Sequence, residues 1–214
     1  MVISTCPQNL RTTPGKTIDN IPSRGYILVF CEFSGDNQNK TEIDLVTKIV
    51  AELNSNMIYA VNGFWNTACG IISPHHEHIN KVKTSIANKL HISPEKVFIG
   101  TVDKLQGQER DAVIVSYGVS SIEKIARESE FIFSLERFNV SITRGKAKTI
   151  VFLSDVLAEP NLKTNVMRFR NPKLERGIDF IHGFTRFMKD PTTGKTVNKE
   201  FPEKKIKVWK KRLN

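Results

Sequence analysis

The sequence predicts an α/β protein built on a doubly wound, mostly parallel β-sheet with helices on both faces. Short runs rich in Val and Ile alternate with segments whose apolar residues recur at helical spacing. The runs are apolar almost throughout, which is typical of strands covered on both faces. With 214 residues, 39% of them hydrophobic and 25% charged, the chain has the composition of an ordinary globular protein.

The first elements along the chain are a strand and a helix. Ile27–Phe33 is an apolar run that predicts a buried strand. The segment from Asn39 to Leu53 predicts a helix, because its apolar residues share one helical face: Ile43, Val46, Val50 and Leu53. Asn39 and Glu42 have the spacing of a capping box at the start of that helix.

The strand–helix alternation continues to about residue 153. Further strands are expected at 69–73, 97–101, 112–117 and 149–153, and further helices over 79–90 and 135–142. Ligands of such sheets bind beyond the C-terminal ends of the strands. Residues 73–78, residues 101–110 and the loops near Arg144 are therefore expected on one functional edge.

Two flanking segments differ from this central part. Residues 1–24 form a polar lead-in with three prolines, residues 25–158 the α/β domain, and residues 159–214 a basic extension expected to be partly disordered. The extension holds 15 Lys and Arg against 6 Asp and Glu, a net charge of +9, whereas residues 1–158 hold 17 against 16. A strand is expected within 178–189 and a hairpin turn at 190–195.

The charge of the extension has two interpretations. A basic tail suits a polyanion such as nucleic acid, because each neutralised phosphate releases condensed counterions. The alternative is a solvated tail or a localisation signal. Charge alone does not decide between them.

Composition excludes several classes of protein. The three cysteines are scattered and form no Cys-x-x-Cys, which argues against a disulfide framework or a zinc ribbon. No apolar stretch approaches the length of a membrane span, and no signal-peptide pattern begins the sequence. We therefore expect an intracellular protein, cytoplasmic or nuclear, without a membrane partner.

The sequence lacks two common nucleotide-binding motifs, the phosphate-binding loop and the dinucleotide-binding glycine motif. Thr13–Thr17 resembles the end of a phosphate-binding loop, but Leu10 stands where that loop needs glycine and no buried strand precedes it. No Gly-x-Gly-x-x-Gly follows the first strand, which argues against a dinucleotide-binding oxidoreductase.

The most informative segment is Thr101–Ser116. Its polar turn around Gly107 joins two expected strands, so the turn presents Gln106, Gln108 and Glu109 to a ligand. Glycine at this place lets the backbone approach closely. The alternative is that Gln-Gly-Gln is only a tight turn.

A second segment, Glu136–Lys146, precedes the last strand. Phe138 and Ile142 fill one face of its expected helix, which leaves Arg137, Arg144 and Lys146 to face an anion. The alternative is a solvated basic helix end.

A third segment, Ile71–His78, holds three histidines and a glutamate. His75 and His78 are three residues apart, but no second cluster completes a tetrahedral site. We therefore predict no metal site.

Four segments in order carry a family resemblance: Asn39-x-x-Glu42, Ile71–Pro74, Thr101–Glu109 and Arg137–Lys146. Together they resemble the second motor domain of superfamily 1 helicases, in the nonsense-mediated-decay and replication-helicase branch. The resemblance covers about residues 26–156. It implies a RecA-like domain of the P-loop NTPase superfamily that forms one wall of an ATP cleft and half of a single-strand channel.

The resemblance also implies roles for individual residues. Arg144 would be the arginine finger to the γ-phosphate, and Gly107, Gln108 and Glu109 would line the nucleotide. The residues expected to contact the nucleic acid are Ser73, Pro74, His75, Thr101, Asp103 and Lys104. Single-stranded RNA or DNA would be the substrate, and ATP with Mg²⁺ would bind only together with a first motor domain, in cis or in trans.

Departures from the family pattern limit these expectations. Leu105 replaces a usual Phe and Gly145 a usual Ala, while His75 and His78 replace an aromatic residue and a Gln. No segment of this sequence corresponds to the first motor domain, with its phosphate loop and magnesium-binding acid. We therefore expect no ATP hydrolysis by this chain alone. The alternative is a stand-alone single-strand-binding or adaptor protein derived from a helicase domain.

Overall fold

The computed structural model describes residues 26–33, 38–55, 63–158, 172–192, 196–201 and 205–213. The lead-in at 1–24, with its phosphate-loop imitation, lies outside these residues. The described strands form one seven-stranded sheet in the order β3-β2-β4-β5-β1-β7-β6. The α/β fold class predicted from the sequence is confirmed.

Five parallel strands make the larger part of the sheet. They are β1 (Tyr26–Phe33), β2 (Cys69–Ile72), β3 (Ile99–Gly100), β4 (Arg110–Ser116) and β5 (Gly145–Ser154). The pairs β1–β5, β2–β3, β2–β4 and β4–β5 are all parallel. The third strand is shorter than the expected 97–101, because residues 94–96 form a 3₁₀ turn immediately before it.

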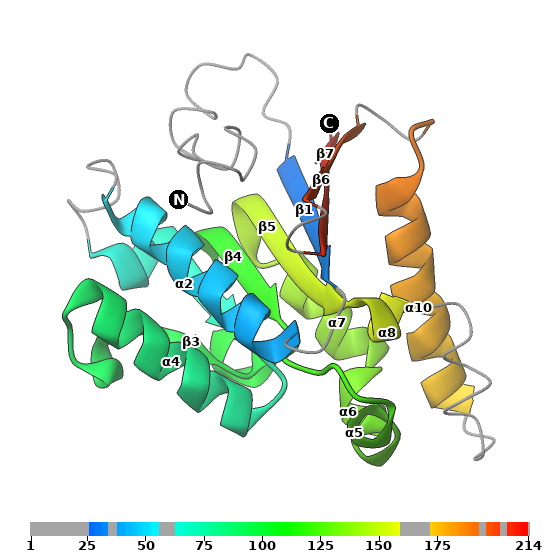
Figure 1. Ribbon diagram of the computed structural model, residues 1–214, viewed down its shortest axis with the longest axis horizontal. Coiled ribbons are helices and arrows are strands. Elements are labelled where there is room, and N and C mark those ends of the chain that lie inside the picture. The colour runs from blue at the N-terminus through cyan, green and yellow to red at the C-terminus, as the bar shows by residue number, and fades with distance from the viewer. Residues whose placement is uncertain are drawn as a thin grey trace.

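Helices cover both faces of this sheet. The helices α2 (Gln38–Ser55) and α4 (His76–Leu90) lie side by side on one face, and α7 (Leu135–Ile142), α8 (Asp155–Ala158) and α10 (Pro172–Lys189) lie on the other (Figure 1). Two short helices, α5 (Ile122–Arg127) and α6 (Ser129–Ile132), precede α7. The π-helix η2 (Phe64–Ala68) and the 3₁₀ helices η3 (Pro94–Lys96) and η4 (Val102–Leu105) complete the described helices.

The central strands are apolar throughout because alternate residues enter two different cores. In β4, Ala112 and Ile114 belong to the core under α2 and α4, whereas Val113 and Val115 belong to the core under α7 and α10. A strand with only one covered face would alternate with polar residues instead. This is why the Val and Ile runs predict the layered architecture.

The expected strand within 178–189 is wrong, because this segment belongs to the 18-residue helix α10. Pro172 stands at its first position, where proline costs no hydrogen bond. Its buried positions recur at helical spacing and pack on the second core: Leu174, Ile178, Ile181, Phe184 and Met188. These apolar residues have helical spacing in the sequence, but their packing on one core appears only in the structure.

The end of the chain extends the sheet. The strand β7 (Ile206–Leu213) pairs antiparallel with β1 on one side and with β6 (Thr196–Phe201) on the other. Trp209 of β7 stacks on Phe30 of β1 with ring centroids 5.2 Å apart. The described part of the basic extension therefore belongs to the same sheet and cores as the rest of the fold.

The turn expected at 190–195 is described only in part. The Asp190 carboxylate accepts the Thr192 backbone N–H at 2.8 Å, which forms a turn after α10. This turn leads from a helix to β6 rather than joining two strands, so it is not a hairpin turn, and residues 193–195 lie outside the described residues. In the part of the chain that the structure describes, no helix is long and apolar enough to cross a membrane.

Candidate nucleotide and nucleic-acid site

The predicted site residues gather at two opposite edges of the sheet rather than at one. Ser73 and Thr101 follow the C-terminal ends of β2 and β3, and the Ser73 N–H donates to the Gly100 carbonyl at 2.9 Å. Gly107, Gln108 and Glu109 instead come just before β4, at its N-terminal end.

Arg144 lies at the same N-terminal edge as the glycine turn. The Arg110 N–H, at the start of β4, donates to the Arg144 carbonyl at 3.1 Å, and Arg110 is in register with Gly145 at the start of β5. The expected single edge is therefore wrong. A residue that precedes a parallel strand lies at the opposite end from one that follows it, and the length of β4 separates the two groups by roughly 20 Å.

The Arg110 side chain holds the turn that carries Gln108 and Glu109. Its Nη2 donates to Gln108 Oε1 at 2.9 Å and its Nη1 to the Glu109 carbonyl at 3.0 Å. Its Nε donates to the Trp65 carbonyl at 3.0 Å, and the guanidinium lies 4.5 Å from the centroid of the Phe98 ring. The sequence analysis did not assign a role to Arg110. The one indication in the sequence was a charged residue at the first position of an otherwise apolar strand.

The turn itself is open to a ligand. Gly107 has φ of 74°, and nothing lies within 4 Å of the position that a Cβ would occupy there. Gly107, Gln108 and Glu109 are exposed. This geometry fits the close approach of a nucleotide to the backbone.

The Arg144 side chain is half-buried immediately before β5. Its Nε donates to the Val140 carbonyl at 3.3 Å, which fixes the root of the guanidinium. Within the described residues its terminal nitrogens meet no hydrogen-bond acceptor or carboxylate. The side chain is thus anchored at one end and able to contact an anion with the other.

The second arginine of this segment is already engaged. The Arg137 guanidinium lies 4.2 Å from the centroid of the Phe131 ring, and its Nη2 is 3.8 Å from the Asp103 carboxylate. The expectation that Arg137 faces an anion freely is therefore wrong. Lys104 is exposed, and its Nζ donates to the Ile99 carbonyl at 3.2 Å.

The Ser73 hydroxyl is fully buried and accepts the His75 backbone N–H at 3.4 Å. It shapes the turn between β2 and α4. Thr101 is half-buried, and Asp103 is exposed. Thr101 and Lys104 are therefore the donors of this group that a nucleic-acid backbone can reach.

A buried polar cluster connects α2 and α4 to the C-terminal end of β4. The Glu42 carboxylate accepts the Ser116 hydroxyl at 2.6 Å and the Gly118 N–H at 3.1 Å, and His78 Nε2 lies 2.7 Å from the Ser116 oxygen. Glu42 therefore ties α2 to the end of β4. The capping-box interpretation is wrong, because this carboxylate faces the interior and Asn39 lies inside the helix.

Burial shifts the pKa values of both ionisable groups in this cluster. Desolvation raises the pKa of Glu42 to about 7, against the opposing hydrogen bonds from Ser116 and Gly118. Desolvation lowers the pKa of His78 to about 4. In the part of the chain that the structure describes, no three His, Cys, Asp or Glu side chains converge on a possible metal position.

The Glu42→Gln substitution should change how stability depends on pH. Above pH 4.5 the unfolded carboxyl has lost its proton, whereas folded Glu42 keeps it up to about pH 7, so Glu42 lowers stability as pH rises through this window. The free energy of unfolding of the variant, measured relative to the unmodified chain, should therefore increase by about 3 kcal/mol as the pH rises from 4.5 to 7.

Urea unfolding at several pH values measures this difference, with the exposed Glu123→Gln variant as control. His78 acts in the opposite direction, because its lowered pKa costs stability as pH falls from 6.5 to about 4. Only the difference between the variant and the unmodified chain therefore isolates Glu42. Parallel pH profiles of the two proteins would contradict the assignment.

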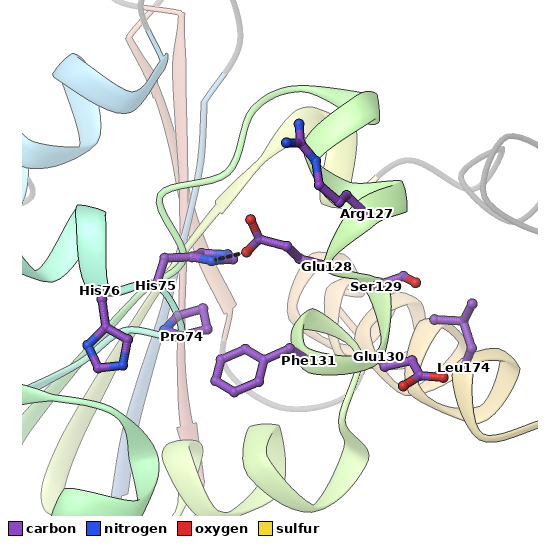
Figure 2. Close-up of a pocket in the computed structure, with 9 residues that line it drawn as sticks. All are labelled: Pro74, His75, His76, Arg127, Glu128, Ser129, Glu130, Phe131 and Leu174. Carbon is purple, nitrogen blue, oxygen red and sulfur yellow. Dashed lines mark ion pairs between the residues drawn. The ribbon is translucent and has the colours of Figure 1, made fainter.

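A cavity of about 600 Å³ lies beside the turn that follows β2. Pro74, His75 and His76 line it on one side, and residues 127–131 line it on the other (Figure 2). Across it, His75 Nδ1 pairs with Glu128 Oε2 at 2.5 Å. His75 is thereby brought together with a helical segment in which sequence reasoning had found no functional residue.

Comparison with known families gives a match over most of the described α/β domain. Residues 30–155 match a family model described as AAA domain. The match spans β1 to the start of α8, and so it includes both edge groups.

Several helicases are similar to this chain. The putative helicase mov-10-B.1 of Danio rerio is 28% identical over 208 residues, which cover 84% of this chain and 20% of that protein. The putative helicase MOV-10 of Gallus gallus is 27% identical over 63% of this chain and 16% of its own length. The DNA replication ATP-dependent helicase/nuclease JHS1 of Arabidopsis thaliana is 28% identical over 61% of this chain and 10% of its length. The chain thus spans a fifth or less of these relatives.

Proposed function

We propose that this chain works as the second motor domain of an ATP-dependent nucleic-acid helicase. The premise is its family: the chain belongs to the AAA domain family, as a motor-domain region of superfamily 1 helicases. In this role it supplies the arginine finger and half of the single-strand channel. Single-stranded RNA or DNA is the substrate, and the site of action is intracellular, cytoplasmic or nuclear. A first motor domain, in cis or in trans, completes the motor.

One observation carries the proposal. The hydrogen bond from the Arg110 N–H to the Arg144 carbonyl joins the end of the open turn at 107–109 to the backbone of the half-buried Arg144. A nucleotide-binding surface needs a backbone segment that the nucleotide can approach closely and a guanidinium that can contact its phosphates. The turn at Gly107 and the Arg144 side chain could supply these two parts at one edge of the sheet. The donors Thr101 and Lys104 stand near the other edge, where a strand can run without meeting the nucleotide.

The proposed mechanism divides the work between the two edges. The Arg144 guanidinium contacts the terminal phosphate and stabilises charge that develops during its transfer. Glu109 accepts a hydrogen bond from a ribose hydroxyl, while Gly107 leaves room for the nucleotide. Mg²⁺-bound ATP supplies the transferable phosphoryl group. Thr101 and Lys104 bind the strand through its backbone, which suits a motor that tracks any sequence.

Turnover tests the proposal directly. The isolated chain should show no ATP hydrolysis above background, because no phosphate-loop lysine or magnesium-binding acid accompanies Arg144. A polypeptide that joins it to a first motor domain should hydrolyse ATP in the presence of a single strand. Robust turnover by the isolated chain that Arg144→Ala abolishes would contradict the proposal.

The charge distribution favours a second candidate, a stand-alone single-strand-binding or adaptor protein. The excess positive charge lies almost entirely within residues 159–214. Deleting these residues cannot test it, because α10 and β7 supply core side chains such as Ile178 and Trp209. Substitutions of exposed basic residues on α10 are the suitable test.

The double substitution Arg176→Gln and Arg186→Gln should weaken single-strand binding if the extension carries it. Both side chains are exposed. Each lost phosphate contact should reduce the slope of log affinity against log salt by about 0.7. Fluorescence anisotropy over a salt series measures the slope. An unchanged slope would contradict the second candidate. Strand binding would then be assigned to Thr101 and Lys104 at the edge of the sheet.

A further inference from the structure

The cavity beside the β2–α4 turn lies at the edge of the sheet assigned to the single strand. Pro74 and His75 directly follow β2, and the Ser73 N–H bond to Gly100 joins this turn to the segment that begins at Thr101. The volume of about 600 Å³ is in the range of small-molecule sites and exceeds what one base needs. A strand that contacts Thr101 would therefore pass the mouth of the cavity.

An aromatic ring forms part of the cavity wall. Phe131 lines the cavity, and in the view of Figure 2 its ring lies between Pro74 and Glu130. Arg137 lies 4.2 Å from its centroid and the His75 ring lies 6.4 Å from it, so the ring is held in place. A fixed aromatic ring is a stacking surface for a base.

The polar groups of the wall accept hydrogen bonds more than they donate them. His75 is 6% exposed, and its Nδ1 faces the Glu128 carboxylate, so Nδ1 carries the proton of the neutral ring. Desolvation favours that neutral ring by lowering the pKa of His75. His75 Nε2 is then an acceptor, and it is buried without a partner among the described residues. Glu128 adds carboxylate oxygens.

Among the described residues that line the cavity, Arg127 is the one arginine or lysine. Arg127 lines the cavity and is exposed, so its guanidinium can reach a phosphate outside while the acceptors face inward. The wall as a whole therefore matches a nucleotide whose base enters and whose phosphate stays at the rim. It does not match a free phosphate, which the Glu128 carboxylate would repel.

We propose that this cavity receives one unstacked base of the bound single strand and favours bases that carry an exocyclic amino group. The inference rests on the proposed function, because it needs the strand at this edge. The amino group would donate to His75 Nε2 or to a carboxylate oxygen. Because Nε2 is covered in the free protein, a side-chain rotation at the wall accompanies entry of the base. Leaving a buried acceptor without a partner is unfavourable, and this favours a ligand that brings a donor.

The experiment compares two labelled pyrimidine strands, oligodeoxycytidylate and oligodeoxythymidylate, each about 12 nucleotides long. Their charge and stacking are similar, but only cytosine carries the amino group. Fluorescence anisotropy should show about fivefold tighter binding of the cytidylate, the equivalent of one hydrogen bond. The His75→Ala variant should abolish the difference while still binding the thymidylate.

A second variant keeps the test informative if His75→Ala does not fold. The Phe131→Leu substitution removes the stacking surface and should weaken binding of both strands about tenfold. Its far-ultraviolet circular dichroism and thermal melting report whether it folds. His91→Asn is the matched control, because His91 is exposed at the end of α4 and asparagine tolerates its φ of 53°.

The outcomes separate the two proposals. Equal binding of both strands, unchanged by either cavity variant but still sensitive to salt, would overturn the base cavity and leave the single-strand function standing. A preference for thymidylate would also overturn the amino-group assignment. Failure of every strand to bind, both to the isolated chain and to the polypeptide that joins it to a first motor domain, would overturn both.

Discussion

Substitution of Arg144 by alanine should lower the ATPase rate of the joined two-domain motor by about 10³- to 10⁵-fold. The guanidinium is anchored through Nε on the Val140 carbonyl, and the Arg144 backbone carbonyl accepts the N–H of Arg110, which follows the open turn at Gly107. Charge that develops on the transferred phosphoryl group would lose its partner on this side of the cleft. Steady-state phosphate release with saturating single strand measures the rate.

Two further variants sharpen this result. Arg144→Lys should restore little activity, because an ammonium lacks the planar fork that contacts two phosphate oxygens. Lys146→Ala is the control: this side chain is exposed two residues away, and its loss should leave the rate within about twofold if only Arg144 acts as the finger. Equal losses for Arg144→Ala and Lys146→Ala would point to general electrostatics instead.

Substitution of Gly177 by alanine should destabilise the fold by about 3 kcal/mol or more, as overpacking of a tight contact does. A Cβ at Gly177 would lie 1.6 Å from the Phe133 carbonyl oxygen, so α10 could not keep its place against the end of α6. For a chain of this size, the melting temperature should fall by roughly 6–12 °C.

The same helix offers a control of opposite sign. Nothing lies within 4 Å of a Cβ placed at Gly183, so alanine there should stabilise α10 by about 0.5–1 kcal/mol through its better helix propensity. Differential scanning calorimetry of both variants measures the two shifts. Equal melting temperatures would mean that α10 does not pack on Phe133 as described.

The layered fold was predictable because its signal is local. Ile114 and Val115 are adjacent in β4 yet enter different cores, so an unbroken apolar run predicts a strand covered on both faces. The helices α2 and α4 were equally visible, since Val46, Val50, Val82 and Ile86 recur at helical spacing and are all buried. Helix α10 was missed because its apolar positions are diluted by charged and polar residues that face solvent.

The candidate site was predictable as a set of residues and not as an arrangement. Glycine and polar side chains marked the turn at 106–109, and the order of the segments marked the resemblance. The position of each group relative to strand direction placed Arg144 and Gly107 at the edge opposite Ser73. The roles of Arg110 and Glu42 depend on partners up to 76 residues away, so no local pattern announced them.

The sequence by itself determined the fold class, the order of the central elements and the family, because apolar periodicity and motif order are properties of neighbouring residues. The tertiary structure decided how those motifs divide between two edges, that the basic extension completes the sheet, and which polar groups lie buried. Those outcomes depend on strand pairing and packing between segments far apart in the chain. Two residues such as Glu42 and Gly118 acquire a common environment only when the intervening helices and strands are in place.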